Sequence, residues 1–224
     1  MKNVIAITQA RMSSTRLPGK VMKTMGSQTM LGLHISRISR SRKITKLVVA
    51  TTENSADDII VMEARKYHAE VFRGSETDVL DRYYQAARTF NAEIIIRITS
   101  DCPLIDPVLI DRAIVLLEES GKDYVANIIK LSFPDGQDTE AFTFATLERA
   151  WKEAVTPYDR EHVTPYIRTH AIGAKSFNIL NFENETDLSN IRMTVDSAED
   201  FLRVEEMVKL HGIEVGWKEY LINN

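Results

Sequence analysis

Short runs of valine, isoleucine and alanine alternate along this chain with longer segments in which apolar residues recur every three or four positions. Runs that predict buried strands lie at 4–7, 47–50 and 94–98, and a shorter one lies near 70–72. Segments with helical spacing, such as 30–38, fill the intervals between them. Strands separated by helices pair in parallel and are covered on both faces. The sequence therefore predicts an α/β protein built on a mostly parallel central sheet.

The alternation becomes less regular in the second half of the chain. Beyond Tyr124 the sequence predicts a turn at 133–136, a strand at 140–144, helices near 147–154 and 161–170, a strand near 177–180, and a last strand at 191–195 before a final helix. No repeat, low-complexity tract or linker divides the sequence, so residues 1–224 are expected to form one domain. Within it, about 130–182 is the predicted region for acceptor binding and for contact between subunits.

Composition and charge exclude several classes of protein. Hydrophobic residues make up 44% of the 224 residues and charged residues 27%, which argues against disorder, and no apolar run approaches the ~18 residues that a membrane span requires. A net charge of -4 carries no nucleic-acid signature. The single cysteine, Cys102, excludes an internal disulfide and fits a reducing compartment. The apolar stretch after Lys2 is too short for a secretory signal, so a cytoplasmic protein without membrane or nucleic-acid partners is expected.

A polar, basic segment over residues 9–20 follows the first predicted strand directly. It carries Arg11, Arg16 and Lys20; guanidinium groups match phosphate oxygens in a bidentate fashion, and lysine adds a mobile positive charge. Hydroxyl and backbone groups at 13–15 offer further donors. Ligands of open α/β sheets bind at the carboxyl ends of strands, so the segment predicts a phosphate-binding loop. The alternative is a solvated basic surface loop.

Two aspartates stand where predicted strands end. Asp101 follows the strand at 94–98, and Asp196 follows the alternating segment at 191–195. Mg²⁺ binds carboxylate oxygens together with the phosphate oxygens of a nucleotide. Read with the basic loop, the pair predicts a site that holds a metal-bound triphosphate. The alternative for each aspartate is a local role, in a turn at Asp101 and in capping the following helix at Asp196.

Three motifs resemble those of a known family. Residues 14–20, Ser-Thr-Arg-Leu-Pro-Gly-Lys, are similar to the N-terminal signature of the CMP-sugar synthetases, the cytidylyltransferases that activate acidic sugars, and look most like the spore-coat polysaccharide (SpsF-like) branch. Residues 101–104 resemble the Asp-x-Pro-Leu motif of the CMP-Kdo enzymes, and residues 195–196 resemble their late Val/Ile-Asp motif, whose aspartates bind magnesium. The likeness reaches about Asp200. The glycine patterns of a Walker A loop and of a dinucleotide fingerprint are both absent.

The resemblance implies a three-layer, Rossmann-like nucleotide-diphospho-sugar transferase fold, with CTP and an acidic sugar as substrates, Mg²⁺ as cofactor and a homodimer as the assembly. The expected catalytic residues are Arg11, Arg16, Lys20, Asp101 and Asp196, the last two as metal ligands. Expected nucleotide contacts also include Ala10, Ser13, Arg73, Gly74, Ser75, Asp78, Thr99 and Ser100, with the 73–78 loop near the cytosine. Expected acceptor contacts are Gln137, Glu140, Arg160 and His162, with solvated surface positions as the alternative.

Departures from the family leave parts of this prediction open. Thr99 and Ser100 stand where some relatives have Gln-Gly, and Thr194 stands where acylneuraminate enzymes have the first aspartate of Asp-x-Asp, so base recognition and the number of metal ions are open. Asp78 is also expected to cap the helix that follows it. No general base is evident. The rival functions are a nucleotidyltransferase that uses another nucleotide with a sugar-phosphate or polyol-phosphate acceptor, and a non-catalytic nucleotide-binding module. The presence of Lys20, Asp101 and Asp196 together argues against the module.

Overall fold

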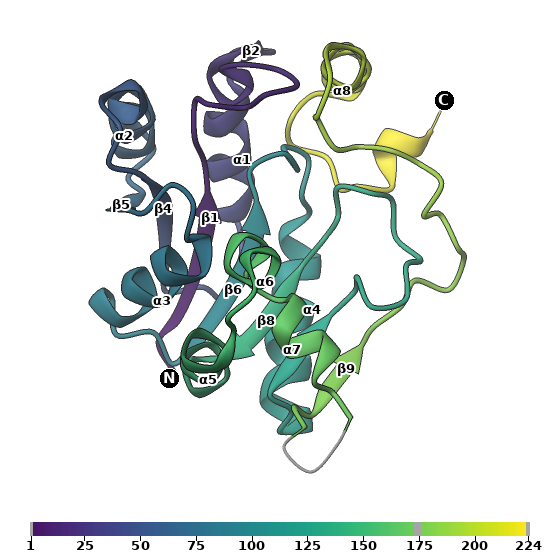
Figure 1. Ribbon diagram of the computed structural model, residues 1–224. Helices are drawn as coiled ribbons and strands as arrows, with labels where there is room; N and C mark the ends of the chain where they lie inside the picture. The colour runs from purple at the N-terminus through teal and green to yellow at the C-terminus, as the bar shows by residue number, and fades with distance from the viewer. Residues whose placement is uncertain (1, 173–175, 223–224) are drawn as a thin grey trace.

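A computed structural model describes residues 2–172 and 176–222 of the chain. The strands of its main sheet are β1 (Val4–Gln9), β4 (Lys46–Thr52), β5 (Glu70–Gly74), β6 (Ile94–Thr99), β7 (Tyr124–Ala126), β8 (Glu140–Thr143) and β9 (Ile179–Asn181). They lie in the order β5-β4-β1-β6-β8-β7-β9 (Figure 1). β8 is antiparallel to both of its neighbours, and the other pairs are parallel. The predicted mostly parallel sheet is confirmed.

Helices cover both faces of this sheet (Figure 1). They are α1 (Met30–Ile38), α2 (Asp58–Lys66), α3 (Val79–Thr89), α4 (Pro107–Ser120), α5 (Phe144–Glu153), α6 (Pro157–His162), α7 (Pro165–Thr169) and α8 (Ala198–His211), with 3-10 turns η1 (Lys20–Met22), η2 (Ser55–Asp57) and η3 (Glu219–Leu221) and a hairpin of β2 (Thr24–Met25) and β3 (Gln28–Thr29). Val4 and Ala6 of β1 pack in one apolar cluster with α1, α2 and α4, and Ile5 and Ile7 pack in another with α3, α5 and α7. Successive side chains of a strand point to opposite faces, so the continuous apolar run of β1 is what a sheet buried on both faces requires.

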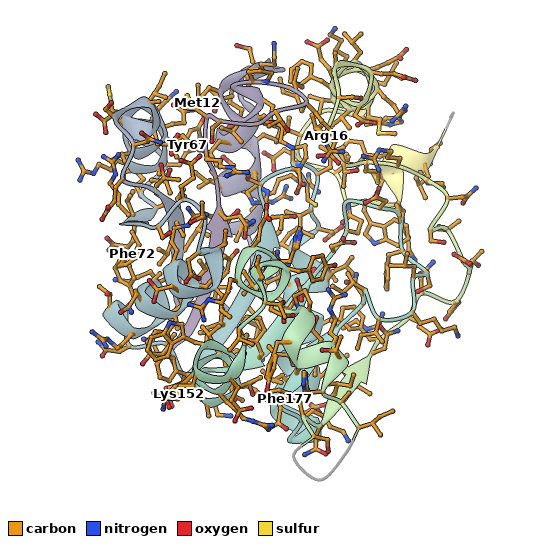
Figure 2. All side chains as sticks on the ribbon, in the orientation of Figure 1. Met12, Arg16, Tyr67, Phe72, Lys152 and Phe177 are labelled. Atoms are coloured by element: carbon orange, nitrogen blue, oxygen red, sulfur yellow. The ribbon has the colours of Figure 1, made fainter. Side chains whose placement is uncertain are left out.

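The connections place a crevice between β1 and β6. β1 pairs with β4 on one side and with β6 on the other, so the chain leaves β1 toward β4 and later returns to the opposite edge of β1. Such a reversal of strand order leaves a ligand crevice at the carboxyl ends of the two strands. Those ends, Gln9 and Thr99, are partners in the register. Figure 2 shows Arg16 at this end of the molecule and Lys152 and Phe177 at the opposite end.

Helix ends follow the capping signals of the sequence. Asp106 caps α4 by accepting a hydrogen bond from a backbone N–H at 2.8 Å, Pro107 occupies the first turn, and Gly121 ends the helix with φ 63°. Asp78 caps α3 in the same way, with a hydrogen bond of 2.9 Å, as predicted. A side-chain cap stabilises a helix by about 1 kcal/mol. None of the described helices combines the length and the apolar character that crossing a membrane requires.

The helix predicted at 161–170 is wrong in one respect, because the structure splits it. α6 ends at His162, and Val163 has a positive φ of 73° before α7 begins at Pro165. The strand predicted at 140–144 is one residue shorter, because Thr143 caps α5 with its side chain. The break after α6 leaves His162 at the end of a short helix rather than in the middle of a long one.

The strand predicted at 191–195 is also wrong, because the described residues place this segment outside the central sheet. It forms an isolated bridge with the loop at Asp135, and its backbone bonds to two loops: the Met193 N–H donates to the Asp135 carbonyl at 2.6 Å, and the Val195 N–H donates to the Asp101 carbonyl at 2.8 Å. Met193 and Val195 are fully buried. The alternation in the sequence therefore records burial of one side of an extended segment and not pairing in a sheet.

Candidate active site

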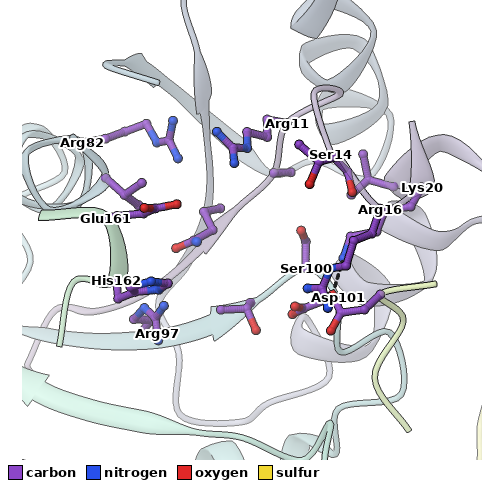
Figure 3. A pocket seen from close by; sticks show the side chains of 17 residues that line it. Arg11, Ser14, Arg16, Lys20, Arg82, Arg97, Ser100, Asp101, Glu161 and His162 are labelled. Atoms are coloured by element: carbon purple, nitrogen blue, oxygen red, sulfur yellow. Dashed lines mark hydrogen bonds and ion pairs between the residues drawn. The ribbon is translucent and has the colours of Figure 1, made fainter. Parts of the chain in front are cut away.

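A cavity of about 310 Å³ opens at the carboxyl ends of β1 and β6, in the crevice that the strand order creates (Figure 3). It is lined by Gln9, Ala10, Arg11, Ser14, Thr15, Arg16, Lys20, Val21, Val79, Arg82, Arg97, Thr99, Ser100, Asp101, Glu161, His162 and Asp196. The fold thus brings the three cations of the basic loop together with the two candidate metal ligands. Of the expected nucleotide contacts, Ala10, Thr99 and Ser100 also line the cavity.

Backbone hydrogen bonds within the basic loop and the carboxylate of Asp57 hold it as a compact turn. The Met12 N–H donates to Asp57 Oδ1 at 2.7 Å, and the Gly19 N–H donates to the Met12 carbonyl at 3.0 Å. Gly19 has φ 66°, and a Cβ at this position would lie 3.2 Å from Met12 Cε. A left-handed conformation with so close a neighbour favours glycine. The Pro18-Gly19 turn therefore brings the chain back so that Lys20 lies in the cavity wall.

Lys20 is anchored, whereas Arg16 is free to change partners. Lys20 Nζ donates to the Val195 carbonyl at 2.7 Å and lies 3.1 Å from Asp196 Oδ1, and its side chain is 13% exposed. Arg16 Nη2 lies 2.9 Å from the same oxygen, but its side chain is 68% exposed. An exposed ion pair contributes only about 0–1 kcal/mol. Arg16 can therefore exchange Asp196 for a phosphate oxygen at little cost, while Lys20 stays in place.

The two aspartates offer a donor set that fits Mg²⁺. Asp101 and Asp196 both line the cavity, and the hydrogen bond from the Val195 N–H to the Asp101 carbonyl joins their backbones. Among the residues the structure describes, no group of three or more His, Cys, Asp or Glu side chains is placed to hold a metal ion. Magnesium in nucleotide sites is usually held by one or two carboxylates, with phosphate oxygens and waters completing the coordination. The residues therefore fit a magnesium ion that arrives with a triphosphate.

The wall opposite Lys20 and Asp101 is also charged (Figure 3). It carries Arg82 from α3, Arg97 from β6, and Glu161 and His162 from the end of α6. Burial alone lowers the pKa of Arg97, but its ion pair with the buried carboxylate of Glu140 outweighs this and raises the pKa above its usual value. Arg82 donates to the Ser75 carbonyl at 2.9 Å. This wall therefore combines two guanidinium groups with the acidic Glu161, and Arg97 is already paired with Glu140.

Arg82 and Arg97 are cavity residues that the sequence did not identify. Arg97 is the one charged residue in the apolar run at 94–98, two positions before Thr99. Residues two apart on a strand point to the same face, so its spacing from Thr99 is the signal that would have found it. No comparable signal marks Arg82, Val21 and Val79 as lining residues, whereas Gln9 belongs to the predicted phosphate-binding loop.

The prediction that Gln137 and Glu140 contact the acceptor is wrong, because both side chains are buried. Gln137 is completely buried; its side chain donates to the Leu104 carbonyl at 2.9 Å and accepts from the Asp106 N–H at 2.9 Å. Glu140 is 2% exposed and accepts hydrogen bonds from Arg97 and from the Tyr124 hydroxyl. Both side chains hold the interior together, because remote groups occupy their polar atoms, and neither reaches a substrate in the cavity.

The structure separates the other two predicted acceptor contacts. His162 lines the cavity. Arg160 instead binds Asp78 Oδ2 through Nε at 3.0 Å and Nη2 at 2.6 Å, and donates to the Trp151 carbonyl at 2.8 Å. These contacts fasten α6 to the start of α3, and Arg160 is not among the residues that line the cavity.

The loop expected near the cytosine lies beside the cavity rather than in its lining. Arg73 donates to the Thr52 carbonyl at 2.7 Å and pairs with Asp58 at 2.5 Å, which directs it away from the cavity. Ser75 and Asp78 serve the start of α3, where Ser75 accepts from the Asp78 N–H at 3.0 Å. The lining residues include none of Arg73, Gly74, Ser75 and Asp78, nor Ser13, whose hydroxyl donates to Glu76 at 2.6 Å. From this side, Val79 and Arg82 reach the cavity instead.

The sheet is Rossmann-like, and a basic loop follows β1. At the point where the strand order reverses, this loop faces two carboxylates. This arrangement is typical of the nucleotidyltransferases. The sequence model of the family described as Cytidylyltransferase matches residues 5–218. The chain therefore belongs to the cytidylyltransferase family and is a nucleotidyltransferase, and the resemblance seen in its motifs is confirmed.

Individual relatives agree with this assignment. The chain is 40% identical over 208 residues to an uncharacterized protein of Methanocaldococcus jannaschii, a match that covers 92% of this chain and 83% of that protein. It is 33% identical over 225 residues to the spore coat polysaccharide biosynthesis protein SpsF of Bacillus subtilis, covering 95% and 89%. A solved cytidylyltransferase from Leptospira borgpetersenii superimposes with a TM-score of 0.93 at 36% identity, covering 99% of this chain and 93% of that one.

Proposed function

We propose that the protein transfers the CMP group of CTP to an acidic sugar of the nonulosonic or octulosonic type, with release of pyrophosphate, in the biosynthesis of a surface polysaccharide. The observation that carries this proposal is the cavity, in which the cations of one loop face Asp101 and Asp196. Membership of the cytidylyltransferase family supports the nucleotide. The similarity to SpsF of Bacillus subtilis, whose name refers to spore coat polysaccharide, supports the kind of pathway.

In this reaction a sugar hydroxyl attacks the α-phosphorus in line and loses its proton to water, and the bond from that phosphorus to the bridging oxygen of the β-phosphate breaks, with its electron pair leaving on pyrophosphate. Arg11, Arg16 and Lys20 would bind the triphosphate oxygens and so orient the leaving pyrophosphate. Asp101 and Asp196 would hold Mg²⁺, which when bound offsets the negative charge that develops on the leaving group.

An acidic acceptor is supported by the opposite wall of the cavity. Arg82, Arg97 and His162 line it together with Glu161, and a carboxylate of the sugar would bind a guanidinium group there in place of water. A sugar-phosphate acceptor, which the rival function uses, would be attracted by the same charges. The acceptor class is therefore the part of the proposal that most needs a direct assay.

The experiment is a pyrophosphate-release grid of four nucleoside triphosphates against nonulosonic acids, octulosonic acids, sugar phosphates and polyol phosphates, with Mg²⁺. The proposal expects turnover with CTP and an acidic sugar. Turnover with a sugar phosphate or polyol phosphate alone would assign the rival function. Absence of turnover across the grid, with nucleotide binding retained, would favour a non-catalytic module.

CTP is expected to be preferred over UTP by about tenfold to a hundredfold in kcat/KM, because cytosine has an amino donor where uracil has a carbonyl acceptor. A site built for one base leaves a buried polar group unpaired with the other, at about 1–3 kcal/mol for each group. Both kcat/KM values are measured at saturating acceptor. Equal values for CTP and UTP would reject cytidylyl transfer as the preferred reaction.

We also propose a homodimer that pairs through the region at about 130–182. Large apolar side chains are exposed in this region, among them Leu131, Val155, Tyr158 and Ile172. These side chains are available for a contact between subunits, and the described residues expose others outside this region, such as Met62 and Leu202. Multi-angle light scattering at micromolar concentration is expected to give the mass of a dimer. A monomer under these conditions would contradict the proposal.

A further inference from the structure

The segment that carries Asp196 lies outside the central sheet and is fixed by few backbone contacts. Its last hydrogen bond to another backbone segment before the aspartate runs from the Val195 N–H to the Asp101 carbonyl, and α8 begins two residues after Asp196, at Ala198. Asp101, in contrast, closely follows β6, which is paired on both sides. The direction of the Asp196 carboxylate therefore depends on the side chains around it.

Arg192 supplies these contacts through all three nitrogens of its guanidinium group. Nη1 lies 2.6 Å from Asp135 Oδ2, Nη2 lies 3.0 Å from Asp196 Oδ2, and Nε lies 2.9 Å from Asp200 Oδ1. Asp200 in turn accepts a hydrogen bond from the Asp196 N–H at 3.1 Å. One arginine thus joins the loop at Asp135, the cavity wall and the first turn of α8.

The two oxygens of Asp196 meet different partners. Oδ2 accepts from Arg192, which is not among the cavity-lining residues, whereas Oδ1 accepts from Arg16 and Lys20, which both line the cavity. Arg192 therefore binds Oδ2 from outside the cavity lining, and Oδ1 is the oxygen that faces the cavity. Release of the exposed Arg16 would open one position on that oxygen to another cation, while Lys20 keeps its own contact with it.

We propose that Arg192 is a positioning residue that presents Oδ1 of Asp196 to a metal-bound triphosphate. This inference rests on the proposed function, in which Asp196 is a magnesium ligand. The planar guanidinium fork directs donors to several carboxylates at once, and a lysine ammonium cannot reproduce those directions. Groups that orient a metal ligand in this way typically change metal affinity by about 10–100-fold when they are removed.

The competing explanation is that Arg192 only fastens α8 to the core, and Arg203 separates the two explanations. Arg203 also binds Asp200, at 2.9 Å, and its other ion pair, with Glu199 at 3.5 Å, stays on α8. The two arginines have nearly equal exposure, 39% for Arg192 and 38% for Arg203. Arg203→Gln is therefore a matched control that disturbs the same helix without touching Asp196.

The test measures binding of Mn²⁺, as a spectroscopic substitute for Mg²⁺, to the protein with CTP present, by electron paramagnetic resonance. Arg192→Gln and Arg192→Lys are expected to weaken Mn²⁺ binding about tenfold or more, while CTP binding in EDTA stays within about twofold of wild type. Arg203→Gln is expected to leave Mn²⁺ binding unchanged. In an Asp196→Asn background, Arg192→Gln should weaken Mn²⁺ binding no further, because the ligand that it positions is already lost.

Wild-type Mn²⁺ affinity in a folded Arg192 variant would overturn the inference, and so would an equal loss in Arg203→Gln. Either result leaves the proposed function standing if Asp196→Asn by itself weakens Mn²⁺ binding. Normal Mn²⁺ binding in Asp196→Asn would remove the metal role from the proposed function and this inference with it. Thermal melting checks each fold, and Arg192→Lys, which keeps the charge, decides the test if Arg192→Gln does not fold.

Discussion

Asp101→Asn and Asp196→Asn are each expected to lower kcat by about a thousandfold or more without unfolding the protein. Both side chains line the cavity, and asparagine keeps the shape of aspartate but loses the charge that holds a divalent cation. Loss of a metal ligand forfeits several kcal/mol of transition-state stabilisation, and every ~1.4 kcal/mol changes the rate tenfold. Pyrophosphate release at saturating CTP, acceptor and Mg²⁺ measures the effect.

Glu199→Gln is the matched control for Asp196→Asn. Glu199 lies three residues further along, in the first turn of α8, and its side chain is 86% exposed. It should keep wild-type turnover. Asp196→Asn should also lower Tm more than Asp101→Asn, because Asp196 forms ion pairs with Arg16 and Lys20 as well as Arg192. Normal turnover in either folded aspartate variant would show that the pair does not hold the metal.

The first half of the fold could be predicted because its signals are local. The runs at 4–7, 47–50 and 94–98 become β1, β4 and β6, since a strand buried on both faces has to be apolar along its length. The segment at 191–195 shows where this reasoning stops. The alternation of apolar and polar residues in this segment correctly predicts that Met193 and Val195 are buried. Pairing in a sheet, however, requires a neighbouring strand, and the alternation does not specify one.

The site, like the fold, has parts that the sequence predicts and parts that it does not. The basic loop was recognisable because its cations and its Pro18-Gly19 turn are adjacent in sequence. Glutamine is usually a surface residue. The side-chain amide of Gln137 is nevertheless hydrogen-bonded to backbone groups of Leu104 and Asp106, which lie more than thirty positions away in the sequence. Arg97 presents the converse case: its spacing from Thr99 indicates which face of the strand it lies on, but the neighbouring segments decide that this face lines a cavity. Contacts between distant segments decide both positions, and residue patterns in one sequence do not record them.

The other large effect is expected in the buried cluster of Glu140, Arg97 and Tyr124. Glu140 is 2% exposed, forms an ion pair with Arg97 and accepts a hydrogen bond from the Tyr124 hydroxyl at 2.5 Å. Glu140→Gln is expected to lower the free energy of unfolding by about 3–5 kcal/mol, because it leaves the Arg97 charge buried without a counter-charge. Denaturation in urea measures the change.

An exposed ion pair provides the control. Lys130 and Glu183 pair at 2.6 Å with side chains that are 74% and 42% exposed. Glu183→Gln is expected to change the free energy of unfolding by no more than about 1 kcal/mol, since water already solvates both charges. Equal losses in Glu183→Gln and Glu140→Gln would show that burial of the Arg97 charge is not the cause.

The effect of Glu140→Gln should depend on pH. Burial alone raises the pKa of Glu140, but the charge of Arg97 and hydrogen bonds to the carboxylate outweigh burial and lower the pKa below its usual value. A lowered pKa in the folded state gives stability that is present above the unfolded pKa of about 4.3 and is lost as pH falls through the folded value. The difference in stability between wild type and Glu140→Gln should therefore shrink below about pH 4.

Removal of both charges should cost less stability than removal of one. In Arg97→Met/Glu140→Leu no charge remains without a partner, and replacing a buried ion pair with apolar side chains of similar volume is often close to neutral. The Tyr124 hydroxyl then lacks its acceptor, at about 1–3 kcal/mol, so the double variant should lie between Glu140→Gln and wild type. A double variant less stable than Glu140→Gln would contradict this account. Because Arg97 lines the cavity, the folded double variant should still lose turnover with an acidic sugar, which separates the contribution of this cluster to stability from its contribution to the site.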